Sequence, residues 1–130
     1  MTDRRPDRVY GILVRDGRVF LWRHAEGVGL PGGVFRRMAE DRKVELKAHL
    51  WDQLAIEATR IWAQGAFTYR NPGEDREMFC GFYTVWEWVG DVPDERGEWL
   101  DVEGVTAALL PPSVKTLLTS VLNTTALRTT

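Results

Sequence analysis

The polar side chains best suited to chemistry lie on one predicted helix, directly after a glycine-rich turn. The turn is Leu30-Pro31-Gly32-Gly33, and the helix is expected over 41–54. At about 100° per residue, four polar residues fall on or beside one side of this helix: Glu45, His49, Asp52 and Gln53. Carboxylate, imidazole and amide groups gathered in this way are candidates for a functional site. The alternative is a solvated helix face with ordinary charges.

This turn and helix together resemble the signature box of the Nudix hydrolases. In that family a glycine after Leu-Pro-Gly is followed by a Glu and then by Arg-Glu-hydrophobic-x-Glu-Glu-x-Gly-hydrophobic on a helix. With one extra residue after Gly33, Glu40 takes the first acidic position, and residues 48–56 (Ala-His-Leu-Trp-Asp-Gln-Leu-Ala-Ile) take the rest. The resemblance implies an α/β fold, a Nudix-like α/β/α sandwich with a mixed β-sheet between helices. It implies one domain over 1–130 with its core at about 9–122.

The resemblance also implies a divalent metal, Mg or Mn, because Nudix helix carboxylates hold cations that bridge a diphosphate and activate water. The candidate metal ligands are the Gly32 carbonyl, His49, Asp52, Gln53 and, as a replacement carboxylate, Glu45. Of the three family Glu positions, only Asp52 keeps a negative charge. Imidazole suits transition metals better than magnesium, so His49 predicts an altered metal preference.

The supporting parts of the box are altered as well. Ala48 stands where the family has an Arg, so Glu40, the structural acid of the box, lacks that partner. Ala55 replaces a helix-ending glycine. If this position is left-handed, the alanine costs on the order of 1 kcal/mol.

Other candidates flank the box. Glu98 and Glu95 lie in or beside an acidic loop where some Nudix proteins place a general base, although a solvated turn is the alternative. Arg23 and His24 end the second predicted strand, where they are placed to meet a phosphate or a base together with Gly33. Rim residues without a role are the alternative for these two.

The strands that would position the box follow from apolar patterning and turn residues. The expected strands are 9–14, 19–22, 59–69, 77–89 and 98–102, with Asp16-Gly17 forming a tight hairpin turn and 71–75 a second turn. The strand over 77–89 is apolar on both faces and is therefore expected to be central. Alternation places Phe82, Trp86 and Trp88 on one face and Tyr83, Val85 and Val89 on the other.

Two helices complete the pattern. Asp41 is expected to cap the first helix, whose core-facing stripe is expected to be Val44, Ala48, Trp51 and Ala55, flanked by Leu50 and Leu54. Pro111-Pro112 begins the second helix, and residues 124–130 are expected to form a frayed polar tail.

Composition narrows the function classes. The 17 basic and 19 acidic residues among 130 give a net charge of -2, which argues against extended nucleic acid or a membrane as partner. A single cysteine, Cys80, excludes an internal disulfide and a Cys-rich zinc site. The charged start of the chain lacks an apolar segment, so a cytoplasmic protein is expected.

Two functions follow from these observations. One is a divergent hydrolase that cleaves a nucleoside diphosphate linked to another group by metal-assisted water attack. The other is a catalytically inactive Nudix domain that binds a nucleotide or another protein. A scaffold that forms a homodimer through its apolar, Trp-rich strand is a third, simpler class.

Overall fold

A computed structural model describes residues 7–24, 27–35, 41–70 and 75–128. Within these residues, seven strands form one sheet: β1 (Arg8–Arg15), β2 (Arg18–His24), β3 (Gly27–Gly29), β4 (Gly32–Val34), β5 (Glu57–Tyr69), β6 (Met78–Val89) and β7 (Gly97–Leu100). The helices are α1 (Arg42–Leu54), α2 (Val102–Ala107) and α3 (Pro112–Arg128), with a 3-10 turn, η1 (Asp94–Arg96). No helix in the described ranges is long and apolar enough to cross a membrane.

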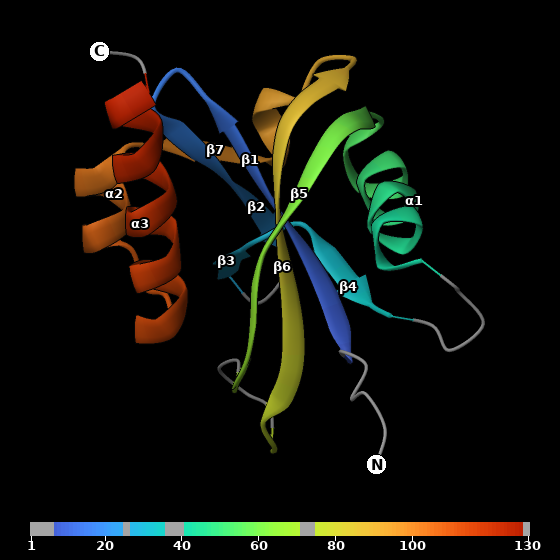
Figure 1. The fold of residues 1–130 in the computed structure, drawn as a ribbon, viewed down its shortest axis with the longest axis horizontal. Helices are drawn as coiled ribbons and strands as arrows, with labels where there is room; N and C mark the ends of the chain where they lie inside the picture. The colour runs from blue at the N-terminus through green and yellow to red at the C-terminus, as the bar shows by residue number, and fades with distance from the viewer. Residues whose placement is uncertain (1–6, 25–26, 36–40, 71–74, 129–130) are drawn as a thin grey trace.

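The sheet is mixed, and helices cover both of its faces. Its strand order is β3-β2-β1-β6-β5, with β4 paired to β1 and β7 paired to β2. Only the β1–β6 pairing is parallel among those of the described strands. α1 packs on one face and α2 with α3 on the other (Figure 1), which confirms the predicted α/β/α sandwich. β6 lies between β1 and β5, so its predicted central position is correct.

Side-chain alternation along β1 builds a core on each face of the sheet. Val9 and Leu13 point to the α1 side, whereas Ile12 and Val14 point to the α3 side. Gly11 faces α1, and a Cβ placed on it would lie 3.5 Å from Leu46 and 3.6 Å from Leu50. The side chains of α1 therefore pack directly on this strand.

β6 departs from simple alternation at its C-terminal end. Trp88 packs in the α1-side core with Tyr83 and Val85, and not with Phe82 and Trp86. The cause is a register shift, because Arg60 pairs with Glu87 whereas Ile61 pairs with Val85, which leaves Trp86 as an extra residue. A bulge of this kind reverses the side-chain direction beyond it. The prediction that Trp88 shares a face with Phe82 is therefore wrong.

Two boundaries near the C-terminus also differ from expectation. The strand predicted to reach Val102 ends at Leu100, because the Asp101 carboxylate accepts the Gly104 N–H at 2.9 Å and begins α2. The predicted polar tail is helical through Arg128. Here the Thr124 hydroxyl donates to the Ser120 carbonyl at 2.9 Å, so this polar side chain is accommodated within the helix.

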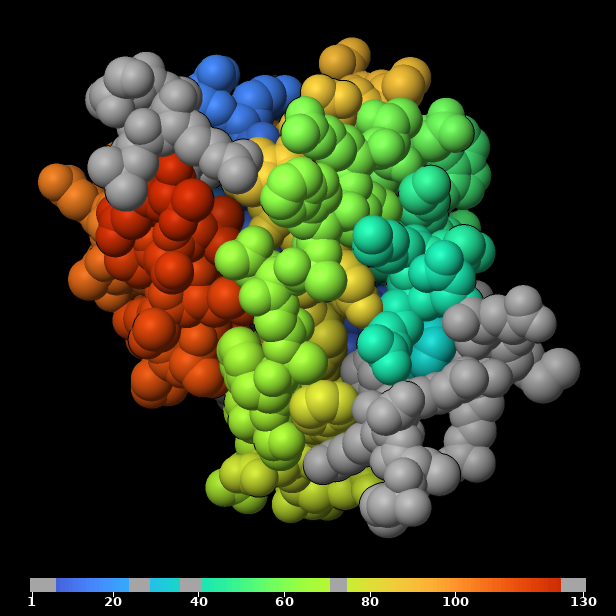
Figure 2. All heavy atoms as spheres, viewed as in Figure 1, coloured from blue at the N-terminus to red at the C-terminus, as the bar shows by residue number. Residues whose placement is uncertain are grey.

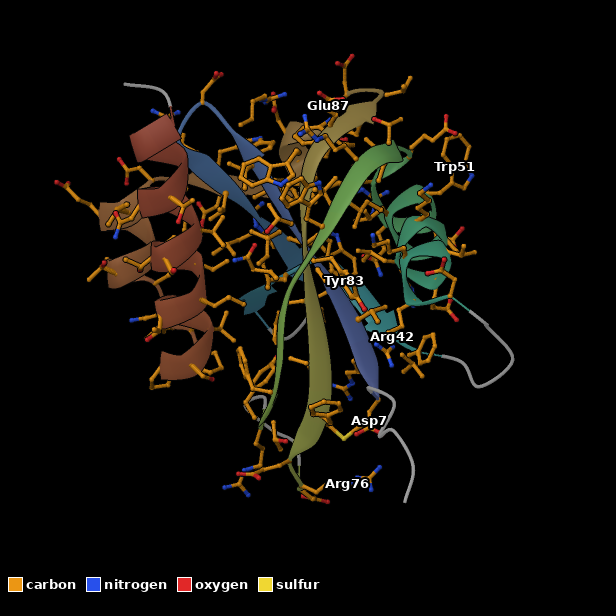
Figure 3. All side chains as sticks on the ribbon, in the orientation of Figure 1. Asp7, Arg42, Trp51, Arg76, Tyr83 and Glu87 are labelled. Carbon is orange, nitrogen blue, oxygen red and sulfur yellow. The ribbon has the colours of Figure 1, made fainter. Side chains whose placement is uncertain are left out.

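Two tyrosines make the fold sensitive to alkaline pH. Burial raises the pKa of Tyr69, and the neighbouring Tyr10 raises it further. Burial also raises the pKa of Tyr83, an effect partly opposed by Arg42, which lies beside Tyr83 in Figure 3. The folded state then holds protons that the unfolded chain releases above its tyrosine pKa of 10.0.

Stability from these groups is therefore complete below the unfolded pKa and is lost as pH rises above it. We expect the melting temperature to fall as pH rises from about 10 to about 11, and to fall less in a Tyr69→Phe/Tyr83→Phe variant. Thermal unfolding of both proteins across this range is the measurement. An equal decline in both proteins would show that other groups cause it.

Candidate functional site

The glycine turn leads into β4, whose backbone packs closely against β1. β4 pairs with β1, with Tyr10 opposite Gly32 and Val9 opposite Gly33. Gly32 has φ 141°, and a Cβ placed on it would lie 2.1 Å from the Val9 carbonyl oxygen. A side chain cannot fit there, so glycine is required by close approach of two backbones.

The free edge of β4 is held by a side chain of α1. The Gly32 N–H donates to Gln53 Oε1 at 3.0 Å, and Gln53 Nε2 donates to the Gly32 carbonyl at 2.8 Å. The two hydrogen bonds fix the orientation of the Gln53 amide. The reversed amide would place its NH₂ group against the Gly32 N–H and its oxygen against the Gly32 carbonyl. Gln53 thus bonds Gly32 as a neighbouring strand would.

His49 makes the second contact with the same edge. Its Nε2 lies 2.9 Å from the Val34 carbonyl oxygen, and its ring packs on Gly33, where an added Cβ would lie 3.0 Å from the ring. A carbonyl oxygen only accepts, so Nε2 carries the proton and donates. We call this arrangement the α1–β4 clamp: His49 and Gln53 bonded to Val34 and Gly32.

The clamp depends on matching repeats of helix and strand. His49 and Gln53 are four residues apart on α1, a rise of about 6 Å, and Gly32 and Val34 are two residues apart on β4, about 6.8 Å. His49 therefore reaches the backbone of Val34, and Gln53 reaches the backbone of Gly32. Val34 was not among the residues expected at the site, and this match of spacings is the only sequence signal that could have indicated it.

α1 turns this face to β4 because a leucine stripe anchors its inner side. Leu46, Leu50 and Leu54 are at most 1% exposed. The Asp41 carboxylate caps the helix by accepting the Lys43 N–H at 2.8 Å, as predicted. Ala55 ends the helix in the left-handed conformation, with φ 56°.

The predicted core stripe of α1 lies on the opposite, outer side. Val44 is 59% exposed and Trp51 is 62% exposed, while Ala48 and Ala55 are also exposed. The prediction that these four residues face the core is therefore wrong. Both stripes have helical spacing, but the leucines carry more apolar volume per position and they meet Gly11 on β1.

The expected exposed cluster of Glu45, His49 and Asp52 is also not what the structure has. Glu45 is 4% exposed, and its Oε2 lies 3.7 Å from His49 Nε2. Asp52 is exposed on the outer flank of α1. The polar residues that face the glycine turn are instead His49 and Gln53, with Glu45 one turn before His49.

This donor set does not fit a divalent cation. The Gly32 carbonyl, an expected ligand, accepts an N–H from Gln53, and His49 Nε2 carries a proton directed at Val34. Magnesium requires several hard oxygen ligands in near-octahedral geometry. In the part of the chain that the structure describes, no three acidic, histidine or cysteine side chains lie close enough to hold a metal ion.

The remaining candidates lie on other elements. Glu95 on η1 and Glu98 on β7 are exposed, and β7 pairs with β2, whereas α1 packs on β1, β4 and β5. Arg23 is exposed on β2 opposite Val28. The side chain of His24, and Glu40 altogether, lie outside the described residues.

This arrangement of strands and helices is the fold of the Nudix hydrolases. Solved structures that share it include MutT from Aliivibrio salmonicida and Vibrio cholerae, with a TM-score of 0.72, 18% identity, and coverage of 93% of this chain and 99% of that chain. The E. coli ORF135 protein gives a TM-score of 0.71 at 22% identity, covering 93% and 91%. A MutT Nudix hydrolase from Burkholderia pseudomallei gives 0.70 at 19% identity, covering 89% and 97%. The sequence matches no family model and no curated protein.

Proposed function

We propose that this chain is a Nudix-fold binding domain in which the α1–β4 clamp stands in place of a hydrolytic metal centre. The observation that carries the proposal is the reciprocal pair of hydrogen bonds between Gln53 and Gly32. Hydrolysis of a diphosphate requires cations that neutralise its oxygens and acidify the attacking water. A side-chain amide supplies neither effect.

The proposed ligand is a nucleoside diphosphate derivative, the compound class that the fold suggests. Arg23 is exposed on β2, opposite Val28 of β3. A guanidinium there can pair with phosphate oxygens and compensate part of their charge without a metal. Binding of this ligand is then expected in the presence of a chelator.

Calorimetry with a panel of nucleoside diphosphate derivatives tests the proposal, with each ligand titrated in chelator and in Mg²⁺. We expect binding of at least one ligand in chelator, no saturable binding of Mg²⁺ alone, and no release of phosphomonoester. An Arg23→Gln variant tests the proposed phosphate contact and should weaken binding by about tenfold. Saturable Mg²⁺ binding with metal-dependent turnover would overturn the proposal.

A divergent hydrolase is the second candidate, and one observation favours it. The Glu45 carboxylate is buried beside His49, at 3.7 Å, next to the glycine turn. If these two residues and Asp52 rearranged to hold a cation, the imidazole nitrogen would favour Mn²⁺ or Co²⁺ over Mg²⁺. Product release assayed with each metal, with His49→Ala as control, tests this candidate. Activity that is highest in Mg²⁺ and insensitive to His49→Ala would contradict the role of His49 as a metal ligand.

Gln53→Glu tests the clamp itself. The variant sets a carboxylate oxygen against the Gly32 carbonyl, so we expect a loss of about 1–3 kcal/mol of stability in chelator. Gln53→Met removes both hydrogen bonds without adding a charge and should lose less. Adding Mg²⁺ should raise the melting temperature of Gln53→Glu, because a cation can bridge two oxygens, and should leave the wild type and Gln53→Met unchanged. A Mg²⁺-dependent rise in the wild type would contradict the clamp as described.

A further inference from the structure

The outer side of α1 lies at the surface of the molecule (Figure 2) and carries an apolar seam that is exposed in the part of the chain that the structure describes. Its members are Val44, Ala48 and Trp51, with Ala55 at the helix end. Val44 is 59% exposed and Trp51 is 62% exposed. Figure 3 shows Trp51 on the far side of α1 from the sheet, pointing away from the molecule.

The spacing of the outer seam is that of a helix–helix contact. Its residues follow one another at intervals of four, three and four, the alternation of the a and d positions in a heptad repeat. Val44 and Trp51 take d positions, while Ala48 and Ala55 take a positions. Because α1 also buries Leu46, Leu50 and Leu54 against the sheet, it is apolar on two opposite sides.

The charged residues beside the seam indicate what binds it. Lys47 precedes the a position at Ala48, and Asp52 follows the d position at Trp51, and both are exposed. These are g and e positions five residues apart, the pair that meets between two parallel helices. Two copies of α1 side by side in parallel would therefore place each Lys47 against the other copy's Asp52.

We propose that the outer seam of α1 binds a second copy of this chain, around a two-fold axis that runs along the helix. This axis places Lys47 of each α1 beside Asp52 of the other copy, on both sides of the contact. An antiparallel pair would instead set Lys47 against Lys47 and Asp52 against Asp52, which is repulsive. The inference concerns the surface opposite the clamp and does not depend on the proposed function.

Sedimentation over about a hundredfold range of concentration tests whether the wild type associates. We expect a concentration-dependent dimer, weakened about a hundredfold by Trp51→Glu, which buries a charge in the seam. Thr59→Glu on β5, exposed but outside the seam, is the matched control and should leave association unchanged. A wild type that stays monomeric, or a dimer unaffected by Trp51→Glu, would overturn the proposal.

Charge reversal tests the parallel arrangement. Lys47→Asp and Asp52→Lys should each weaken self-association by about tenfold, because each change makes two like-charged contacts. An equimolar mixture of the two single variants should associate at least as well as the wild type, since every contact again joins opposite charges. The double variant should also recover. If the mixture associates no better than either variant alone, the parallel pairing is wrong. Unchanged thermal unfolding of dilute samples will show that the substitutions leave the fold intact.

Discussion

Gly32→Ala is expected to destabilise the fold by at least about 3 kcal/mol, a large share of the 5–15 kcal/mol typical of a whole domain. Two causes add. The φ of 141° is unfavourable for any residue with a Cβ, and that Cβ would lie 2.1 Å from the Val9 carbonyl oxygen. Relief requires β4 to move away from β1, which also disturbs the two hydrogen bonds between Gly32 and Gln53. Chemical denaturation at equilibrium is the measurement.

Gly65→Ala is the matched control for this change. Gly65 lies in β5, and a Cβ added to it would meet nothing within 4 Å. Its backbone is also outside the left-handed region, so we expect a change within about 1 kcal/mol, towards higher stability. If Gly32→Ala behaves like Gly65→Ala, the close packing of β4 on β1 is not as described.

Leu50→Ala is expected to cost about 2–5 kcal/mol, whereas Trp51→Ala should cost less than about 1 kcal/mol in a dilute sample. Leu50 is 0% exposed between α1 and the sheet, and its removal leaves a cavity above Gly11. Trp51 is 62% exposed and loses little contact within its own chain. Denaturant unfolding of both variants gives the comparison.

This pair of variants decides which side of α1 is buried. The sequence pattern predicted that Trp51 faces the core, and the structure assigns that place to Leu50. A larger loss from Trp51→Ala than from Leu50→Ala, measured below the concentration at which the chain associates, would return the helix to the predicted orientation.

The local features of the fold were predictable because their causes lie within a few residues. Asp16-Gly17 forms the expected hairpin turn, with φ values of 53° and 73°. Asp41 caps α1 through the N–H of Lys43, two residues on. The longer strands followed from apolar and β-branched residues over short stretches, whereas β4 was expected only as a glycine turn. With the order of strands and helices, and a Leu-Pro-Gly-Gly turn, these local signals were sufficient to predict the Nudix fold.

Where sequence prediction failed, the cause was contact between distant residues. The bulge at Trp86 depends on how β5 pairs with β6, so it redirected Trp88 without any signal in β6 itself. The buried side of α1 depends on contacts with β1, more than thirty residues earlier, where Gly11 faces Leu46 and Leu50.

The candidate site divides in the same way. The sequence by itself determined that His49 and Gln53 replace two family carboxylates and that Gly32 precedes them in a glycine turn. Only the tertiary structure decided what these residues do. Gln53 and Gly32 are 21 positions apart in the sequence. Their two hydrogen bonds form because α1 packs beside β4, where a four-residue step along the helix is about as long as a two-residue step along the strand. A polar residue type indicates what a side chain can bind, but the partner within reach determines what it does bind.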